Sequence, residues 1–132
     1  MGVYTGIAKD NVTINSGNAR LDSMGYTSAT FGTVTQATNK STAVTLNTMT
    51  GRITMHNASL GNNASANFDL NNSNIAANDV VLVNVAGGGT AGAYLAGVCC
   101  ASEGVAKIKL INLSGGALAE PVQILFTVIK VG

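Results

Sequence analysis

From Thr33 to the C-terminus, apolar and polar residues alternate in short runs separated by turns rich in glycine, asparagine and serine. Strict alternation is typical of strands with one buried face, because successive side chains of a strand point to opposite faces. In "GRITMH", Ile53 and Met55 share one face, and Phe68 and Leu70 do the same in "ANFDLN". Roughly seven or eight such segments, with no clear helix, predict an all-β fold, an antiparallel β-sandwich of jelly-roll-like type.

Residues 1–31 differ in composition from the rest of the 132-residue chain. Their few large apolar side chains are spread thinly among Gly, Asn, Ser and Asp, too few to form a core of their own. We interpret residues 1–31 as an extended N-terminal arm or irregular segment, in which "NVTIN" is one short strand pattern. Residues 32–132 are the predicted β-sandwich domain, and the chain has the usual length of one domain.

Two predicted strands are apolar on both faces. One contains residues 80–83, which read "VVLV", and the other runs from Ile124 to Val131. In an antiparallel sandwich one face of each strand normally meets water, so these strands need a second cover. The arm, a loop or a neighbouring subunit would provide it.

The low charge of the chain favours the neighbouring subunit. Charged residues make up 10% of the sequence and the net charge is +1, whereas about 25% is usual. A net charge close to zero promotes association. We therefore predict contacts to other subunits, or to a larger assembly, at Tyr4, Ile7, Val81, Val83, Leu125 and Ile129.

Gly87, Gly89 and Gly92 match the G-x-G-x-x-G spacing of a dinucleotide-binding turn. Such a site requires an acidic residue about 20 residues further on, near the end of the next strand, to bind the ribose. The sequence there reads "KLIN" and contains no acid. A flexible loop between two strands is the favoured interpretation, and we predict no cofactor.

The other reactive residues form no recognisable catalytic or metal-binding pattern. His56, the single histidine, falls beside Arg52 on the outward face of a predicted strand, which indicates a surface or interface residue. Cys99 and Cys100 are adjacent, whereas zinc sites use spaced pairs, so we expect two small buried or half-buried thiols. The six acidic residues form no close pair and no D-x-D loop. We predict no catalytic residues, no metal site and no enzymatic activity.

The seven Lys and Arg residues are scattered and have no interleaved aromatic residues, unlike the basic patches that bind nucleic acid. Lys107 and Lys109 alternate with Ile108 and Leu110, which is typical of a solvated strand face. No apolar run approaches the ~20 residues needed to span a bilayer. We expect neither nucleic acid nor membrane as a partner.

Three stretches resemble a recurrent small β domain of tailed bacteriophages, found in short virion proteins and in tail-fibre or spike proteins. They read "GTVTQATNKSTAVTLNTMTGRITM", "NDVVLVNVAGGGTAGAYLAG" and "NLSGGALAEPVQILFTVIKVG". The resemblance extends from Gly32 to the C-terminus, and "GTVTQATNKSTAVTLN" is its most specific part. It implies a β-sandwich, trimeric assembly and a structural role on the virion, with no catalytic residues to transfer.

Two roles on the virion are compatible with this resemblance. In the first, the protein is a head decoration (cement) protein, a homotrimer that binds the major capsid protein on the outer surface of the phage head. The shortness of the chain favours this role. In the second, it is a tail-fibre, spike or adsorption protein that binds host-surface glycan. Sugar sites favour aromatic platforms, and the chain has three Tyr, three Phe and no Trp, so the first role is the expectation.

Overall fold

The computed structural model describes residues 25–131. Within this range a single 3-10 turn, η1 (Ser28–Thr30), precedes eight strands. The strands are β1 (Phe31–Thr35), β2 (Val44–Thr45), β3 (Thr50–Thr54), β4 (Ser65–Asn71), β5 (Val80–Gly87), β6 (Tyr94–Ser102), β7 (Val105–Asn112) and β8 (Gln123–Ile129). In the described part of the chain, no helix is long and apolar enough to cross a membrane.

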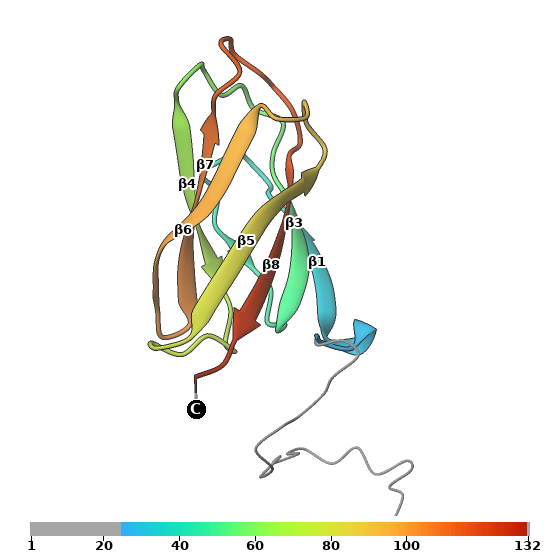
Figure 1. Cartoon of the computed structure of the whole chain (residues 1–132), viewed down its shortest axis with the longest axis vertical. Coiled ribbons are helices and arrows are strands. Elements are labelled where there is room, and N and C mark those ends of the chain that lie inside the picture. The colour runs from blue at the N-terminus through green and yellow to red at the C-terminus, as the bar shows by residue number, and fades with distance from the viewer. Residues whose placement is uncertain (1–24, 132) are drawn as a thin grey trace, which may run out of the picture.

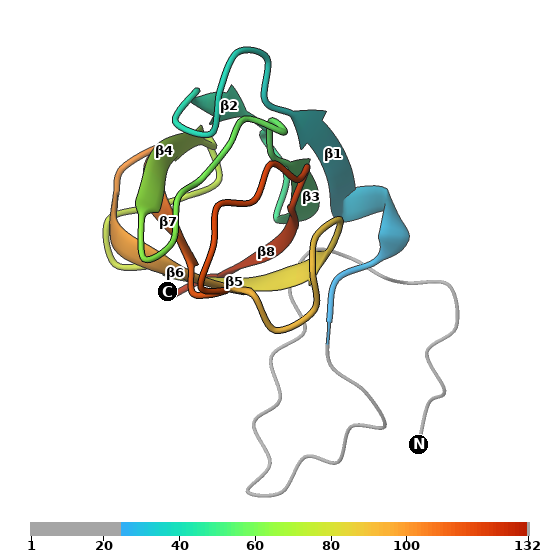
Figure 2. The ribbon, with the colours of Figure 1, turned by 90° about the horizontal axis from the view of Figure 1, so that it is seen from above.

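The strands form two four-stranded sheets packed against each other, which confirms the predicted all-β sandwich (Figure 1). Sheet A has the order β1-β3-β8-β5, and sheet B has the order β2-β4-β7-β6. The view from above shows β5 and β6 side by side, at one side of the sandwich (Figure 2). Four of the six strand pairings are antiparallel, but β1–β3 and β2–β4 are parallel, so each sheet is mixed and not purely antiparallel as predicted.

The core lies between the two sheets and contains the alternating apolar residues predicted from the sequence. Ile53 pairs with Ile124 in sheet A, and Phe68 pairs with Ile108 in sheet B. Each of these four side chains is buried between the sheets, while the alternate residues along the same strands point outward. Strand alternation therefore determines which side of each sheet faces the core. The largest fully buried side chains are Phe68, Phe126, Ile53, Met55, Leu70, Ile75, Ile108, Leu110, Ile124, Val122 and Val128.

One glycine makes room for the largest core residue of sheet A. Gly51 lies on the inner face of β3, opposite Phe126 of β8. A Cβ atom at this position would lie 2.9 Å from the Phe126 ring and 2.8 Å from the Gly32 carbonyl oxygen. A side chain at position 51 would therefore displace either the ring or the neighbouring strand β1.

The chain reaches sheet A through a short segment that lies on its outer face. The Tyr26 hydroxyl donates a hydrogen bond to the Val128 carbonyl oxygen, near the end of β8. Strand β1 begins at Phe31, next to the predicted domain start at residue 32. The "NVTIN" strand pattern and the predicted contact residues Tyr4 and Ile7 lie outside the described residues.

A bulge in β6 changes the expected environment of the two cysteines. The register shifts between Val98, which pairs with Ile108, and Cys100, which pairs with Lys107. Cys99 is the inserted residue, and both Cys99 and Cys100 are exposed free thiols. The prediction of buried or half-buried thiols was wrong, because a bulge interrupts the alternation of faces along a strand.

Candidate functional site

The outer face of sheet A carries exposed apolar side chains on two neighbouring strands. Val80 and Leu82 on β5 are 45% and 51% exposed, and Ile129 on β8 is 44% exposed. Val80 lies directly beside Ile129 in the sheet, and half-buried Leu125 lies further along β8 on the same face. We call these four residues the apolar band.

The predicted contact residues of sheet A lie on two different faces of the sheet. Val81 is buried in the core, and half-buried Val83 packs against the core. Their neighbours Val80 and Leu82 point outward instead. The residues that would need a second cover on the outer face of sheet A are therefore Val80, Leu82, Leu125 and Ile129. Their contacts with another subunit stay a prediction.

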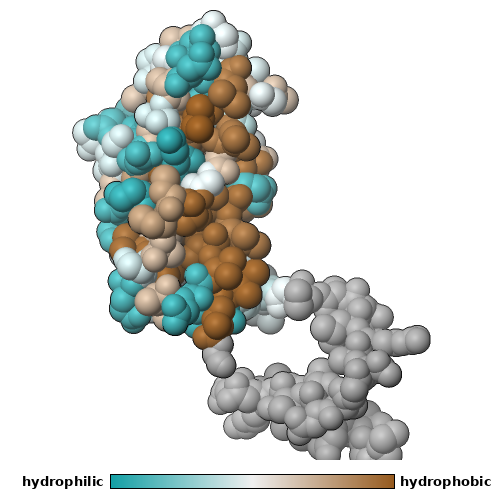
Figure 3. Space-filling model, turned by 60° about the vertical axis from the view of Figure 1, so that its left-hand side comes forward, coloured by the Kyte–Doolittle hydropathy of each residue, from teal (hydrophilic) through white to brown (hydrophobic). Residues whose placement is uncertain are grey.

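The outer face of sheet B is polar by comparison. Lys107 on β7 pairs with Asp69 on β4, with 2.7 Å between the lysine nitrogen and a carboxylate oxygen. This ion pair raises the pKa of Lys107. Lys109 and Asn67 are neighbours on the same face, so the predicted solvated strand face is confirmed. In Figure 3 a brown, hydrophobic strip runs along the side of the molecule formed by β5 and β6, beside a surface that is largely teal and white.

The two strands on this side of the molecule contain no charged residue. β5 is the last strand of sheet A and β6 is the last strand of sheet B, so each has an unpaired edge. Between Asp79 and Glu103 the sequence contains neither a charged residue nor a proline. Proteins usually protect exposed edge strands with lysines, prolines or bulges, because unpaired edges bind other strands. Here only the bulges near Gly87 and Cys99 are present.

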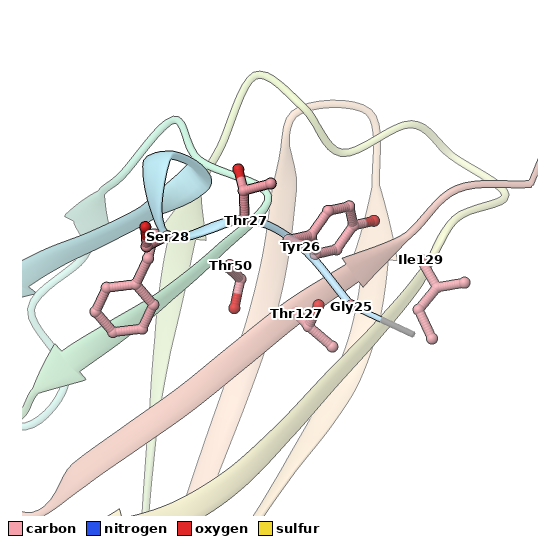
Figure 4. A pocket seen from close by; sticks show the side chains of 8 residues that line it. Gly25, Tyr26, Thr27, Ser28, Thr50, Thr127 and Ile129 are labelled. Carbon is pink, nitrogen blue, oxygen red and sulfur yellow. The ribbon is translucent and has the colours of Figure 1, made fainter. Parts of the chain in front are cut away.

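A groove lies where the described chain begins, at one end of the apolar band (Figure 4). It has a volume of about 800 Å³ and lies between the Gly25–Phe31 segment and the outer ends of β3 and β8. We call it the N-terminal groove. It is lined mainly by Tyr26, Ser28, Phe31, Thr50, Thr127 and Ile129. Because Ile129 belongs to both, the groove and the apolar band form one continuous surface.

The C-terminal end of the band is fixed by a buried carboxylate. Asp79 accepts a hydrogen bond from the Lys130 ammonium group, and others from the backbone N–H groups of Ala76, at 2.8 Å, and Val131, at 3.1 Å. These bonds, the Lys130 bond most of all, lower the pKa of Asp79 to about 2. The carboxylate therefore holds the chain that follows β8 against the loop that precedes β5.

A buried polar cluster, which no sequence pattern predicted, lies in the loops that follow β1 and β3. The Lys40 ammonium group donates hydrogen bonds to the carbonyl oxygens of His56 and Glu120, the latter at 2.6 Å. Burial lowers the pKa of Lys40, and the nearby Glu120 carboxylate opposes this shift. The Gln36 side chain donates to the Lys40 carbonyl oxygen and accepts from the His56 N–H, both at 3.0 Å. These bonds join three loops, so we assign the cluster a structural role.

The glycine-rich loop between β5 and β6 is fixed by Glu120. The Glu120 carboxylate accepts hydrogen bonds from the Thr90 N–H at 2.9 Å, the Thr90 hydroxyl at 2.7 Å and the Tyr94 hydroxyl at 2.8 Å. These bonds lower the pKa of Glu120, while burial and the carboxylate raise the pKa of Tyr94 to about 12. Gly88 has φ +74°, and a Cβ there would lie 2.2 Å from the Pro121 carbonyl oxygen. The segment is therefore a loop between two strands, as predicted, but it is held in place by these bonds and is not the flexible loop that the sequence indicated.

The remaining candidate residues do not come together. His56 is half-buried just after β3, and its Nδ1 atom accepts a hydrogen bond from the Ala58 N–H at 3.0 Å. Among residues 25–131 there is no group of three His, Cys, Asp or Glu side chains placed to bind a metal ion.

Comparison of the chain with protein-family models, curated proteins and solved structures gives no significant match. An exposed, contiguous apolar area bordered by polar residues is typical of an interaction site.

Proposed function

We propose that this protein is a structural component of a phage virion, a homotrimer that decorates the outer surface of the head and stabilises the shell. The apolar band beside the uncharged edge of β5 carries this proposal, because it is a surface that water solvates poorly. The bacteriophage resemblance of the sequence supplies the setting. A β-sandwich of jelly-roll-like type is part of the proposal, and the alternation of β1 to β6 between the two sheets supports it.

The size of the band indicates what else the interface must contain. Burying a Val, Leu or Ile side chain completely is worth about 1.5–3 kcal/mol. Half-exposed side chains therefore have on the order of 1 kcal/mol each still to gain. Four of them contribute about as much as the smallest estimated cost of association, roughly 4 kcal/mol. A stable trimer must add backbone pairing or further contacts, and the unpaired edge of β5 lies next to the band.

The proposed mechanism is adhesion without turnover. A protein that binds the assembled shell but not its separated subunits stabilises the shell by mass action. The major capsid protein is the proposed partner, and the N-terminal arm is the proposed element that engages it, because extended segments readily add a strand to a neighbouring sheet.

A second candidate function is host adsorption through glycan binding, and one observation favours it. The N-terminal groove presents two aromatic rings, Tyr26 and Phe31, beside the hydroxyl groups of Ser28 and Thr127. Aromatic faces combined with a few polar groups are typical of small-ligand sites. A glycan array with a clear hit that is lost in Tyr26→Ala would favour this function over decoration.

The decoration function is tested by binding purified protein to isolated head shells and, separately, to isolated tails of the phage that encodes it. Co-sedimentation with heads, followed by imaging of three-fold density on their outer surface, is the expected result. Deleting residues 1–24, which leaves Tyr26 and β1 in place, is expected to abolish binding while the protein still folds and associates. Decoration of shells by the truncated protein would contradict the role of the arm, and binding to tails alone would contradict the head location.

A further inference from the structure

We propose that the N-terminal groove is a docking site for residues Asn11 to Asn15 of the same polypeptide chain, with Val12 and Ile14 as the anchoring side chains. This assigns an occupant to the groove that adjoins the apolar band. The inference concerns the free subunit and does not depend on the virion role.

The chemistry of the groove selects an apolar, uncharged guest. Three of its lining side chains, Tyr26, Phe31 and Ile129, are large, and they are 42%, 41% and 44% exposed. None of the described residues that line it is Asp, Glu, Lys, Arg or His. A volume of about 800 Å³ is within the range of about 300–1,000 Å³ typical of ligand sites. A charged guest would lose its hydration in the groove without gaining a partner.

The segment from Asn11 to Asn15 has the matching properties. The first 24 residues carry charges at Lys9, Asp10, Arg20 and Asp22, and the stretch between Asp10 and Arg20 carries none. Within it, Val12 and Ile14 alternate with Thr13, so an extended segment places both β-branched side chains on one face. One face of such a segment fits an apolar groove, and the other faces water.

The tether makes this guest more effective than a free one. The described chain begins at Gly25, which itself lines the groove. Ile14 is eleven residues away, and a chain spans at most about 3.6 Å per residue, or about 40 Å here, so the segment has ample length to return. Tethering through a short linker gives effective concentrations in the millimolar range. Weak apolar contacts therefore suffice for docking.

The groove also offers hydrogen-bond partners for an extended backbone. The Thr50 hydroxyl already donates to the Phe126 carbonyl oxygen at 2.8 Å. The hydroxyl groups of Ser28 and Thr127 make no hydrogen bond to another described residue and lie at the groove. Because each backbone N–H and C=O needs a partner when water is excluded, these hydroxyls suit a peptide guest.

Disulfide trapping in the full chain tests this docking. In a Cys99→Ser, Cys100→Ser background, Asn15→Cys is combined with Ser28→Cys, and Ala8→Cys with Ser28→Cys is the matched control. Oxidised glutathione takes up the two electrons and two protons of the thiols, yielding two glutathione thiols and one protein disulfide. Chain length alone favours the first pair over the control by only about twofold, since loop closure depends weakly on length.

Docking predicts intrachain disulfide formation at least ten times faster for the Asn15→Cys pair than for the control. Adding Ile14→Ser is expected to remove this excess, whereas adding Val3→Ser is expected to leave it unchanged. Equal rates within about twofold, or no effect of Ile14→Ser, would overturn the proposal. A disulfide that forms between chains, at a rate that rises with protein concentration, would overturn it in favour of the segment of a second copy.

Discussion

The outer faces of the two sheets differ, although their inner faces are alike. On sheet B, Lys107 and Asp69 form an exposed ion pair, whereas the exposed Leu95 of β6 lies beside half-buried Ile111 of β7 on the same face. On sheet A, Val80, Leu82 and Ile129 are exposed apolar side chains, and the adjoining edge of β5 has no charge. The difference indicates where on the sandwich we propose that a partner binds.

The two outer faces enclose the same core, so packing of the core does not explain why their side chains differ. A β-sandwich is stable with two polar outer faces, and apolar residues on one of them add nothing to the packing between sheets. Exposed apolar residues next to an open edge favour association. We infer that a partner covers the apolar band of sheet A, and that the part of sheet B around Lys107 and Asp69 faces water.

Substitutions in the core are expected to have the largest effect on stability, and they test whether the inner faces of the two sheets contribute equally. Phe126 of sheet A and Phe68 of sheet B are each 2% exposed. Replacing either one with Ala is expected to lower the free energy of unfolding by about 3–5 kcal/mol, because each change leaves a cavity in a close-packed core. Urea denaturation measures both variants. A cost below about 1 kcal/mol for one of them would show that one sheet contributes little to the core.

A smaller effect is expected at the buried carboxylate beside the apolar band. Asp79→Asn removes the charge that binds Lys130 and weakens the acceptor of the Ala76 and Val131 N–H groups, so the Tm at pH 7 is expected to fall by several degrees. The folded protein holds the pKa of Asp79 at about 2, below its usual value of 3.8. The stabilisation is therefore present above pH 4 and is lost as the pH falls from about 4 to about 2.

The difference in Tm between the wild-type protein and Asp79→Asn is thus expected to shrink across this pH window. Scanning calorimetry from pH 2 to pH 7 measures it. A difference that stays constant with pH would contradict a charge-based role for Asp79.

The smallest effect is expected at the corresponding ion pair on sheet B. Asp69→Asn breaks the contact with Lys107, but both side chains are close to half exposed, and exposed ion pairs contribute little because water and salt screen them. The Tm is expected to change by less than for Asp79→Asn, and the remaining change is expected to vanish at high salt. A loss as large as that of Asp79→Asn would show that sheet B is not simply a solvated face.

The sequence predicted the strands in which apolar residues alternate with polar ones. On β3 and β4, apolar residues such as Ile53 and Phe68 alternate with polar ones, and their burial was correctly predicted. On β5 all four residues from 80 to 83 are apolar, so no pattern distinguishes Val81 and Val83, which point inward, from Val80 and Leu82. The sequence indicated that a second cover was needed but not which side chains require it.

Most of the candidate site could not be predicted from the sequence. The N-terminal groove combines Tyr26, Phe31, Thr50 and Thr127, which are brought together only by the pairing of β1, β3 and β8. The bulge that exposes Cys99 has no residue signature, since a bulge is a shift in the pairing of two strands. Both features depend on long-range contacts, which local patterns do not encode.

We propose that another copy of the chain covers the apolar outer face of sheet A. Light scattering coupled to size exclusion, at micromolar concentration, tests it with two matched variants. Leu82→Glu places a charge on the band, and Asn67→Glu places the same charge on the outer face of sheet B. For the wild-type protein and for Asn67→Glu we expect a trimer of about 40 kDa, three times the 13.3 kDa of the subunit. For Leu82→Glu we expect a monomer. A wild-type monomer, or a Leu82→Glu variant that keeps the full mass, would contradict it.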